Sequence, residues 1–330
     1  MTEIPKADMP PSRPRLRWLD IARGVALIAM ASYHFMWDLS MFGYLEPGYA
    51  ATGWPKIYAR SIASSFLFLA GFSLVLAHGR GIRWRSFWKR WLVIAGAAAL
   101  VTVASYFAIP QGLIHFGILH AIAAVSLIGL LFLRVPVALT ILIAVAALVA
   151  PFYLAADAFN QPWLWWIGLS TEPRQSFDYV PLLPWLAPAL AGIAVARLPF
   201  VQGLLRQNTS VHNPPGWAQT TLSFLGRHSL VFYLVHQPVL LSILYGVSLA
   251  YPAPGHPEAF IESCEAACLP EADEGFCRRY CRCALDGLEK DELLAPLQSG
   301  TMPESYRGDI DKIRSQCTAE AGQALDETGN

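Results

Sequence analysis

Four ionisable residues share one face of a long apolar stretch near the N-terminus. Residues 19–42 read LDIARGVALIAMASYHFMWDLSMF and contain Asp20, Arg23, His34 and Asp38. At about 100° per residue, with Asp20 at 0°, Arg23 falls at about 300° and His34 at about 320°. Asp38 returns to about 0°, roughly 27 Å along the helix from Asp20, which is close to the thickness of the hydrocarbon core of a bilayer. The sequence therefore predicts a polar stripe on a membrane-spanning helix.

This stripe suits proton-transfer chemistry. A charged group that faces lipid is costly, so we expect the stripe to face a bundle interior or a water-filled cavity. Asp20 and Arg23 could serve only as headgroup-level caps, but that role does not account for His34 and Asp38 on the same line. An imidazole can accept the proton of an attacking hydroxyl or amine, which makes His34 the candidate general base. Asp38, one turn later, could orient it, and Asp20 could pair with Arg23.

Composition places these residues in a polytopic membrane protein. The chain has 330 residues, of which 55% are hydrophobic and 15% charged, and its mean hydropathy is +0.39. Its net charge of zero averages two unlike parts: residues 1–250 carry 17 Lys and Arg against 8 Asp and Glu, and residues 251–330 carry 7 against 16. We expect a disordered basic cytoplasmic tail over residues 1–17, a membrane domain over 18–250, and an acidic cysteine-rich domain over 251–330.

The apolar runs predict an all-α helix bundle of about seven spans with a small helical, disulfide-rich C-terminal domain. The expected spans are residues 19–42, 57–78, 87–109, 113–133, 137–156, 180–198 and 222–250. Three prolines in the sixth predict an irregular or kinked helix. The N-terminal tail and the loops on the same side of the membrane carry twelve Lys and Arg, against two or three in the loops on the other side. The N-terminus is therefore expected in the cytoplasm and the C-terminal domain outside. The predicted location is the plasma (cell inner) membrane.

Other spans contribute further candidates. Arg60 in the second span could be a snorkelling anchor or a ligand for an anionic group, and Gly71 and Ser73 read as helix-packing residues. His115 and His120 in the fourth span lie about 140° apart around a helix, so they cannot both face one point. Each of them could equally well be an interhelical hydrogen-bonding residue.

The seventh span carries a second polar face. Ser229, Tyr233 and His236 step by four and three residues and therefore share one side of a helix. Arg227 and His228 stand near its predicted cytoplasmic start, where Arg227 could meet a phosphate and His228 reads better as an anchor. The histidine spacings indicate no metal site, and no basic–aromatic pattern for nucleic acid is present.

All six cysteines lie beyond residue 250. Cys264 with Cys268, and Cys277 with Cys281, have the CxxxC spacing that puts both thiols on one helix face. Two such helices in an antiparallel hairpin would pair Cys268 with Cys277 and Cys264 with Cys281, which leaves Cys283 for Cys317. Disulfides fit a small domain in an oxidising compartment. The alternative is a cytoplasmic zinc site of four thiolates, which requires an even number of spans.

Four motifs, in order, give the chain a family resemblance. They are DIARGVALIAMASYH with the following FMWDL, then FLFLAGFSL, FGILHAIA and GRHSLVFYLVHQPVL. Over about residues 15–250 the chain resembles bacterial relatives of the heparan-alpha-glucosaminide N-acetyltransferase catalytic domain, within the wider group of transmembrane acyltransferases. In the lysosomal enzyme an Asn tends to stand at the position of His34, so in this respect the chain is nearer the wider group.

The resemblance implies an acyltransferase that uses cytoplasmic acetyl-CoA or another acyl-CoA and a sugar or amino-sugar acceptor near the outer face. It implies His34 and Asp38 as catalytic residues and favours His120 over His115. The substrate-binding candidates are Asp20, Arg23, Arg60, His120, Arg227, Ser229, Tyr233 and His236. Direct transfer and transfer through an acyl-histidine both fit these residues. The bilayer is a further expected partner, and so is a second copy of the chain in a homo-oligomer.

Two other functions remain open from the sequence. A proton-coupled transporter or channel could use the Asp, Arg and His stripe as a relay. Many transporter folds are built from internal repeats, and the sequence shows none. This favours the enzyme over the transporter. An inactive scaffold, in which the cysteine-rich tail matters most, is the third interpretation.

Overall fold

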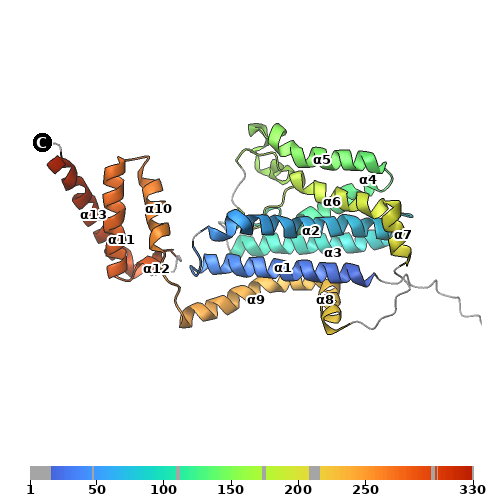
Figure 1. The fold of residues 1–330 in the computed structure, drawn as a ribbon, viewed down its shortest axis with the longest axis horizontal. Helices are drawn as coiled ribbons and strands as arrows, with labels where there is room; N and C mark the ends of the chain where they lie inside the picture. The colour runs from blue at the N-terminus through green and yellow to red at the C-terminus, as the bar shows by residue number, and fades with distance from the viewer. Residues whose placement is uncertain are drawn as a thin grey trace, which may run out of the picture. The chain divides into compact units, whose positions relative to one another are not determined.

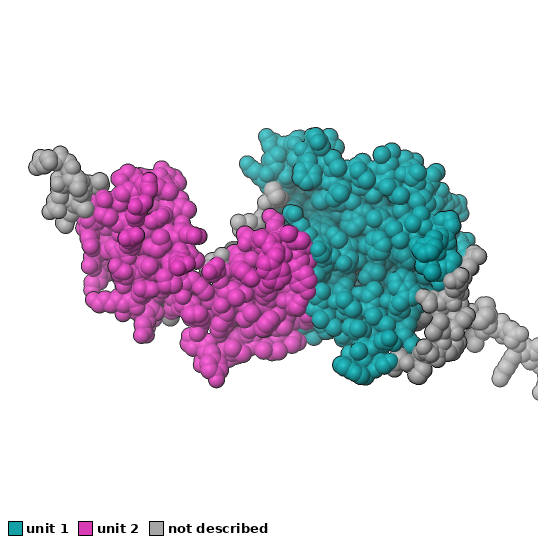
Figure 2. All heavy atoms as spheres, viewed as in Figure 1, with its two compact units in different colours: residues 1–30, 59–235 teal, residues 31–58, 236–330 magenta. Residues whose placement is uncertain are grey.

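A computed structural model describes residues 16–46, 48–108, 112–172, 176–207, 216–298, 302 and 304–328. Over these residues the chain is helical and has no strand. It divides into two compact units, which Figure 2 distinguishes by colour. Unit 1 is Met1–Met30 with Ala59–Val235, and unit 2 is Ala31–Tyr58 with His236–Asn330. Most of the expected N-terminal tail, residues 1–15, lies outside the described residues.

Thirteen α-helices make up most of the described chain (Figure 1). They are α1 (Arg17–Met41), α2 (Gly53–His78), α3 (Trp84–Ala108), α4 (Ile118–Phe132), α5 (Val137–Leu154), α6 (Leu182–Arg197), α7 (Pro199–Gln207), α8 (Trp217–Arg227), α9 (Ser229–Ala250), α10 (Pro257–Cys268), α11 (Glu274–Lys290), α12 (Leu294–Gln298) and α13 (Arg307–Thr328). Short 3-10 turns over Asp157–Phe159 and Pro162–Ile167 lie between the fifth and sixth expected spans.

The helices support a membrane protein but do not confirm seven spans. Among the described residues, α2, α3, α5 and α9 are long and apolar enough to cross a bilayer. The pair α6 and α7, bent by 71°, would make a fifth span. Helix α4 is apolar but has only 15 residues. Helix α1 has 25 residues, yet it carries the polar stripe and is not among these candidates.

Local backbone geometry moves several predicted boundaries. The fourth predicted span becomes helical only at Ile118, because Gly117 is extended (φ −92°, ψ −172°). The seventh is divided, since α8 ends at Arg227 and α9 begins at Ser229. The predicted irregularity of the sixth is confirmed, because Leu183 has non-helical angles (φ −103°, ψ 128°).

Glycines let the helices of unit 1 approach closely. Its core includes the fully buried Leu67, Leu190 and Ile193. A Cβ added at Gly71 on α2 would collide with the backbone of Ala189 on α6, and one added at Gly192 on α6 would collide with the backbone of α2. This agrees with the packing role expected for Gly71.

Helices α1 and α8 meet in the same way. A Cβ at Gly24 would collide with the Leu222 carbonyl, and one at Gly226 would collide with the Asp20 carbonyl. The two backbones are therefore in direct contact beside Asp20. This close approach brings the polar residues of α8 within reach of those on α1.

The cysteine-rich part of unit 2 is a three-helix arrangement held by disulfides. Helix α11 packs against both α10 and α13, and these three lie side by side in Figure 1. Cys264 is bonded to Cys281, Cys268 to Cys277 and Cys283 to Cys317, with Cα–Cα separations of 5.8, 5.6 and 5.5 Å. These are the three pairs that the antiparallel hairpin predicts. Leu288, Leu293 and Ile313 form its small apolar core.

Hydrogen bonds tie the segment before α10 to the loop after α1. His256 Nε2 lies 2.9 Å from the Gly43 carbonyl oxygen, and the Tyr44 hydroxyl donates to the Tyr251 carbonyl at 2.5 Å. Gln298 on α12 exchanges two hydrogen bonds with the His256 backbone. These hydrogen bonds therefore link the segment that leads into the cysteine-rich helices to the loop after α1.

We expect Gly192→Ala to lower the free energy of unfolding by about 1–3 kcal/mol, because the new methyl group has no room against α2. Gly96→Ala on α3 is the matched control, since a Cβ there meets nothing within 4 Å. It should raise stability by about 0.5–1 kcal/mol through the entropy of the unfolded chain. Thermal unfolding of the purified protein in detergent measures both. Equal shifts for the two variants would contradict the close packing of α2 and α6.

Candidate functional site

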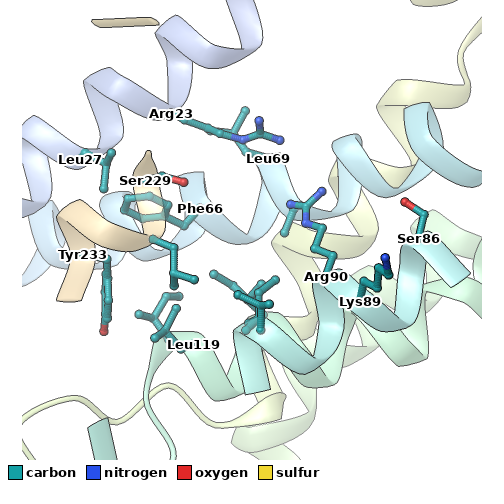
Figure 3. A pocket seen from close by; sticks show the side chains of 16 residues that line it. Arg23, Leu27, Phe66, Leu69, Ser86, Lys89, Arg90, Leu119, Ser229 and Tyr233 are labelled. Atoms are coloured by element: carbon teal, nitrogen blue, oxygen red, sulfur yellow. The ribbon is translucent and has the colours of Figure 1, made fainter. Parts of the chain in front are cut away.

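A cavity of about 500 Å³ lies in unit 1. Side chains from α1, α2, α3, α4 and α9 line it. Its charged residues are Arg23, Lys89 and Arg90, and its remaining polar residues are Ser86, Ser229 and Tyr233. In Figure 3, Ser86, Lys89 and Arg90 lie together on α3, across the cavity from Ser229 and Tyr233 on α9. The cavity thus has a cationic end.

Two hydrogen-bonding groups hold Arg23 in place. Its Nη2 donates to Ser73 Oγ at 2.6 Å, and its Nη1 donates to Asp20 Oδ1 at 3.4 Å. Asp20 Oδ2 also lies 3.6 Å from Nε of Arg227 on α8. One carboxylate thus faces two guanidinium groups, which includes the pair expected between Asp20 and Arg23.

The cations that line the cavity differ from those predicted, because Lys89 and Arg90 are among them and Arg227 is not. Arg227, a predicted phosphate ligand, is directed to Asp20 and to Ser223 Oγ, which it meets at 3.0 Å. Neither Lys89 nor Arg90 forms an ion pair in the part of the chain that the structure describes. From the sequence, these two residues indicated only the topology. Ser86, Lys89, Arg90 and Val93 are separated by three- and four-residue intervals, and this spacing indicates that they share one face of α3.

An acid just before α6 organises the cavity wall at α4. Asp178 Oδ2 accepts a hydrogen bond from the Ile118 backbone N–H at 2.9 Å and another from the Tyr233 hydroxyl at 3.3 Å. It therefore caps the start of α4 from outside that helix. Burial raises the pKa of the Asp178 carboxyl, and the hydrogen bonds from Ile118 and Tyr233 oppose that rise. Sequence reasoning missed Asp178, whose only signal was an acid directly before a predicted span.

His120 and His115 do not line the cavity. His120 Nδ1 accepts from the Gly117 N–H at 3.2 Å, and its Nε2 lies 3.2 Å from Thr102 Oγ1. The Thr102 hydroxyl donates to the Ile114 carbonyl at 2.7 Å, so Nε2 of His120 must be the donor to Thr102. Both ring nitrogens therefore help to fix the start of α4. The ring of His115 packs 5.4 Å from that of Trp165, measured between centroids.

Unit 2 contains a second polar cluster. The rings of His34 on α1 and His236 on α9 have centroids 5.0 Å apart at an angle of 65°. Asp38 is fully buried, and its Oδ1 accepts from Gln237 Nε2 at 2.6 Å. Among the described residues, Asp38 Oδ2 and Gln237 Oε1 have no hydrogen-bond partner. The structure thus brings together three predicted residues and adds Gln237.

The partner of Asp38 differs from the one expected. The sequence suggested that Asp38 orients His34, but the described hydrogen bond of Asp38 is to Gln237. An orienting role toward His34 stays a prediction. An uncharged amide carries no distinctive sequence signal, which is why Gln237 was not singled out.

The remaining candidates, Arg60 and His228, do not contribute to the cavity lining. Arg60 is exposed and does not line the cavity. His228 stacks on Phe224 at a centroid distance of 4.4 Å, and its Nδ1 lies 2.9 Å from the Phe224 carbonyl oxygen. These contacts agree with the anchoring role favoured for His228. Among the described residues, no group of three or more His, Cys, Asp or Glu could hold a metal ion.

The apolar helices, the cavity and the buried polar side chains are those of a membrane protein with polar groups in its interior. A family model described as heparan-alpha-glucosaminide N-acetyltransferase, catalytic, matches residues 15–238, and the chain belongs to this family. Membership supports a transmembrane acetyltransferase. The cysteine-rich helices α10 to α13 lie beyond the match. No curated protein and no solved structure matches the chain.

We expect Gln237→Leu to lower the free energy of unfolding by about 1–3 kcal/mol, because it removes the donor that the buried Asp38 carboxyl uses. The double variant Asp38→Leu with Gln237→Leu should recover part of this loss, since it removes both polar groups together. A double-mutant cycle with Asp38→Leu, followed by thermal unfolding, measures the coupling. Simple additivity of the two single changes would show that the hydrogen bond contributes nothing.

Proposed function

We propose that this protein is a membrane acyltransferase that takes an acyl group from cytoplasmic acyl-CoA. The acceptor in this proposal is a hydroxyl or amine of an extracytoplasmic sugar or glycan. Family membership supports the transferase class, and the observation that carries the donor assignment is the cavity whose lining includes Arg23, Lys89 and Arg90.

The cationic end suits the phosphates of CoA. Arginine and lysine bind phosphate through charge-assisted hydrogen bonds, which are stronger than those between neutral groups. Arg23 is held by Ser73 and Asp20, so its guanidinium is already positioned. Lys89 and Arg90 lie close to the start of α3, which begins at Trp84. The distribution of Lys and Arg favours a cytoplasmic location for this end of the helix, where CoA esters are made.

His34 is the proposed general base. The acceptor oxygen or nitrogen attacks the thioester carbon, a new C–O or C–N bond forms, and the C–S bond breaks. The imidazole accepts the proton that the acceptor loses and returns one to the departing CoA thiolate. His34 lies beside His236, which supports a role in proton transfer because two imidazoles can accept and donate in turn.

The proposal keeps the N-terminus in the cytoplasm and the cysteine-rich domain outside. Seven crossings would count α1, α4 and the α6–α7 pair together with α2, α3, α5 and α9. The three disulfides of α10, α11 and α13 support an extracytoplasmic domain, because such bonds persist in oxidising compartments.

We expect the double variant Lys89→Ala with Arg90→Ala to bind CoA at least about tenfold more weakly, since it loses two charge-assisted contacts. Arg85→Ala on the same helix is the control, because Arg85 is exposed and does not line the cavity. Isothermal titration of the purified protein measures the affinities. Binding of pantetheine, which lacks the phosphates, should be unaffected. An equal loss for pantetheine and CoA would contradict a phosphate site.

We expect His34→Ala to lower acyl transfer by about 100-fold or more while CoA binding and thermal unfolding stay close to those of the unchanged protein. Asp38→Asn should have a smaller effect, since it keeps the base. The assay follows release of free CoA thiol with sugar acceptors, together with mass spectra of envelope glycans from cells with and without the protein. Full activity of His34→Ala would rule out this residue as the base. Proton flux in liposomes without thioester cleavage would favour a transporter.

A further inference from the structure

Arg227 is a cation of unit 1 that does not line the cavity. It is the last residue of α8, and its side chain is held at two points. Its Nη2 donates to Oγ of the buried Ser223 at 3.0 Å, and its Nε lies 3.6 Å from Asp20 Oδ2. The backbones of Gly226 and Asp20 are in direct contact next to this pair. The packing of α8 therefore directs Arg227 towards α1.

The carboxylate that Arg227 meets also faces Arg23, which does line the cavity. The distance from Arg23 Nη1 to Asp20 Oδ1 is 3.4 Å, longer than the roughly 2.7–2.9 Å of a close charge-assisted hydrogen bond. The shorter contact of Arg23, at 2.6 Å, is to the neutral hydroxyl of Ser73. A neutral group thus helps to hold the Arg23 guanidinium, while the negative charge of Asp20 is divided between two cations.

This sharing affects how strongly the cavity attracts an anion. The side chains of Asp20 and Arg23 are only 12% and 21% exposed, so water and salt screen their charges less than those of surface groups. With Arg227 in place, two positive charges face one negative charge. Without Arg227, Asp20 would face Arg23 alone, and the carboxylate would offset most of the attraction that Arg23 exerts on a phosphate. A ligand without charge would bind almost equally well in both cases.

We propose that Arg227 is a positioning residue for the donor: by sharing Asp20, it keeps the charge of Arg23 available to the CoA phosphates. This rests on the proposed function, because it takes Arg23, Lys89 and Arg90 as the phosphate ligands. In Figure 3 the Arg23 side chain, from α1, and the Arg90 side chain, from α3, extend towards the same part of the cavity. Arg227 acts through a carboxylate and touches no part of the ligand, unlike the direct phosphate contact that the sequence suggested.

Three ligands test this role. Isothermal titration of the purified full-length protein uses CoA, adenosine 3′,5′-bisphosphate, which has phosphates but no thiol arm, and pantetheine, which has the arm but no phosphates. We expect Arg227→Ala to bind CoA and the bisphosphate about three- to fivefold more weakly and pantetheine with unchanged affinity. Arg227→Lys keeps the charge and should keep most of the affinity. Arg134→Ala, at an exposed position outside the cavity lining, should leave all three affinities unchanged.

A double-mutant cycle shows whether Arg227 acts through Asp20. In an Asp20→Asn background no carboxylate is left to share, so Arg227→Ala should change CoA affinity by less than about twofold. The same loss in both backgrounds would mean that Arg227 meets the phosphates itself, and would overturn the proposal. If Asp20→Asn does not fold, the comparison of ligands and the Arg227→Lys variant decide the question on their own.

Other outcomes separate this proposal from the proposed function. An equal loss of affinity for all three ligands in Arg227→Ala would show that the residue only packs α8 against α1, and would overturn the positioning role. If the double variant Lys89→Ala with Arg90→Ala weakens CoA binding but Arg227→Ala does not, the donor assignment stands and only this proposal falls. If CoA does not bind to the unchanged protein, both fall.

Discussion

An acidic side chain among apolar helices needs an ion-pair or hydrogen-bond partner, and helix α1 has two such acids, Asp20 and Asp38. Asp20 lies between Arg23 and Arg227, and Asp38 accepts a hydrogen bond from Gln237. Leaving such a group without a partner costs far more than a typical contact gains. These two acids therefore fix how α1 faces α8 in unit 1 and α9 in unit 2. That alignment also places the two residues of α1 that line the cavity, Arg23 and Leu27.

Close backbone contact makes these pairs possible. Gly24 and Gly226 bring α1 and α8 together beside Asp20, and short side chains such as that of Ser73 fill the remaining space around Arg23. Small residues act in the same way between α2 and α6, in the core of unit 1. The cavity therefore lies among helices that are in close backbone contact elsewhere.

Much of this could be predicted from the sequence where the pattern is local. The helix that carries the polar stripe and the pairing of Asp20 with Arg23 follow from helical periodicity over a few turns. The disulfide partners follow from a hairpin of two such helices, with Cys283 and Cys317 as the remaining pair. Asp178 and Gln237 could not be predicted in their roles, because each acts on a residue at least 55 positions away. The ends of α4 and α8 depend on single backbone conformations at Gly117 and His228, which hydropathy does not detect.

The distance in sequence between Asp38 and Gln237 has a consequence for how the protein is made. The two residues are 199 positions apart, and α1 leaves the ribosome long before α9 exists. Throughout that interval the carboxyl of Asp38 lacks the amide that accompanies it in the folded protein. The contacts of α1 seen in the folded chain are therefore complete only after synthesis reaches α9, so the first helix to be translated is among the last to gain its final partners.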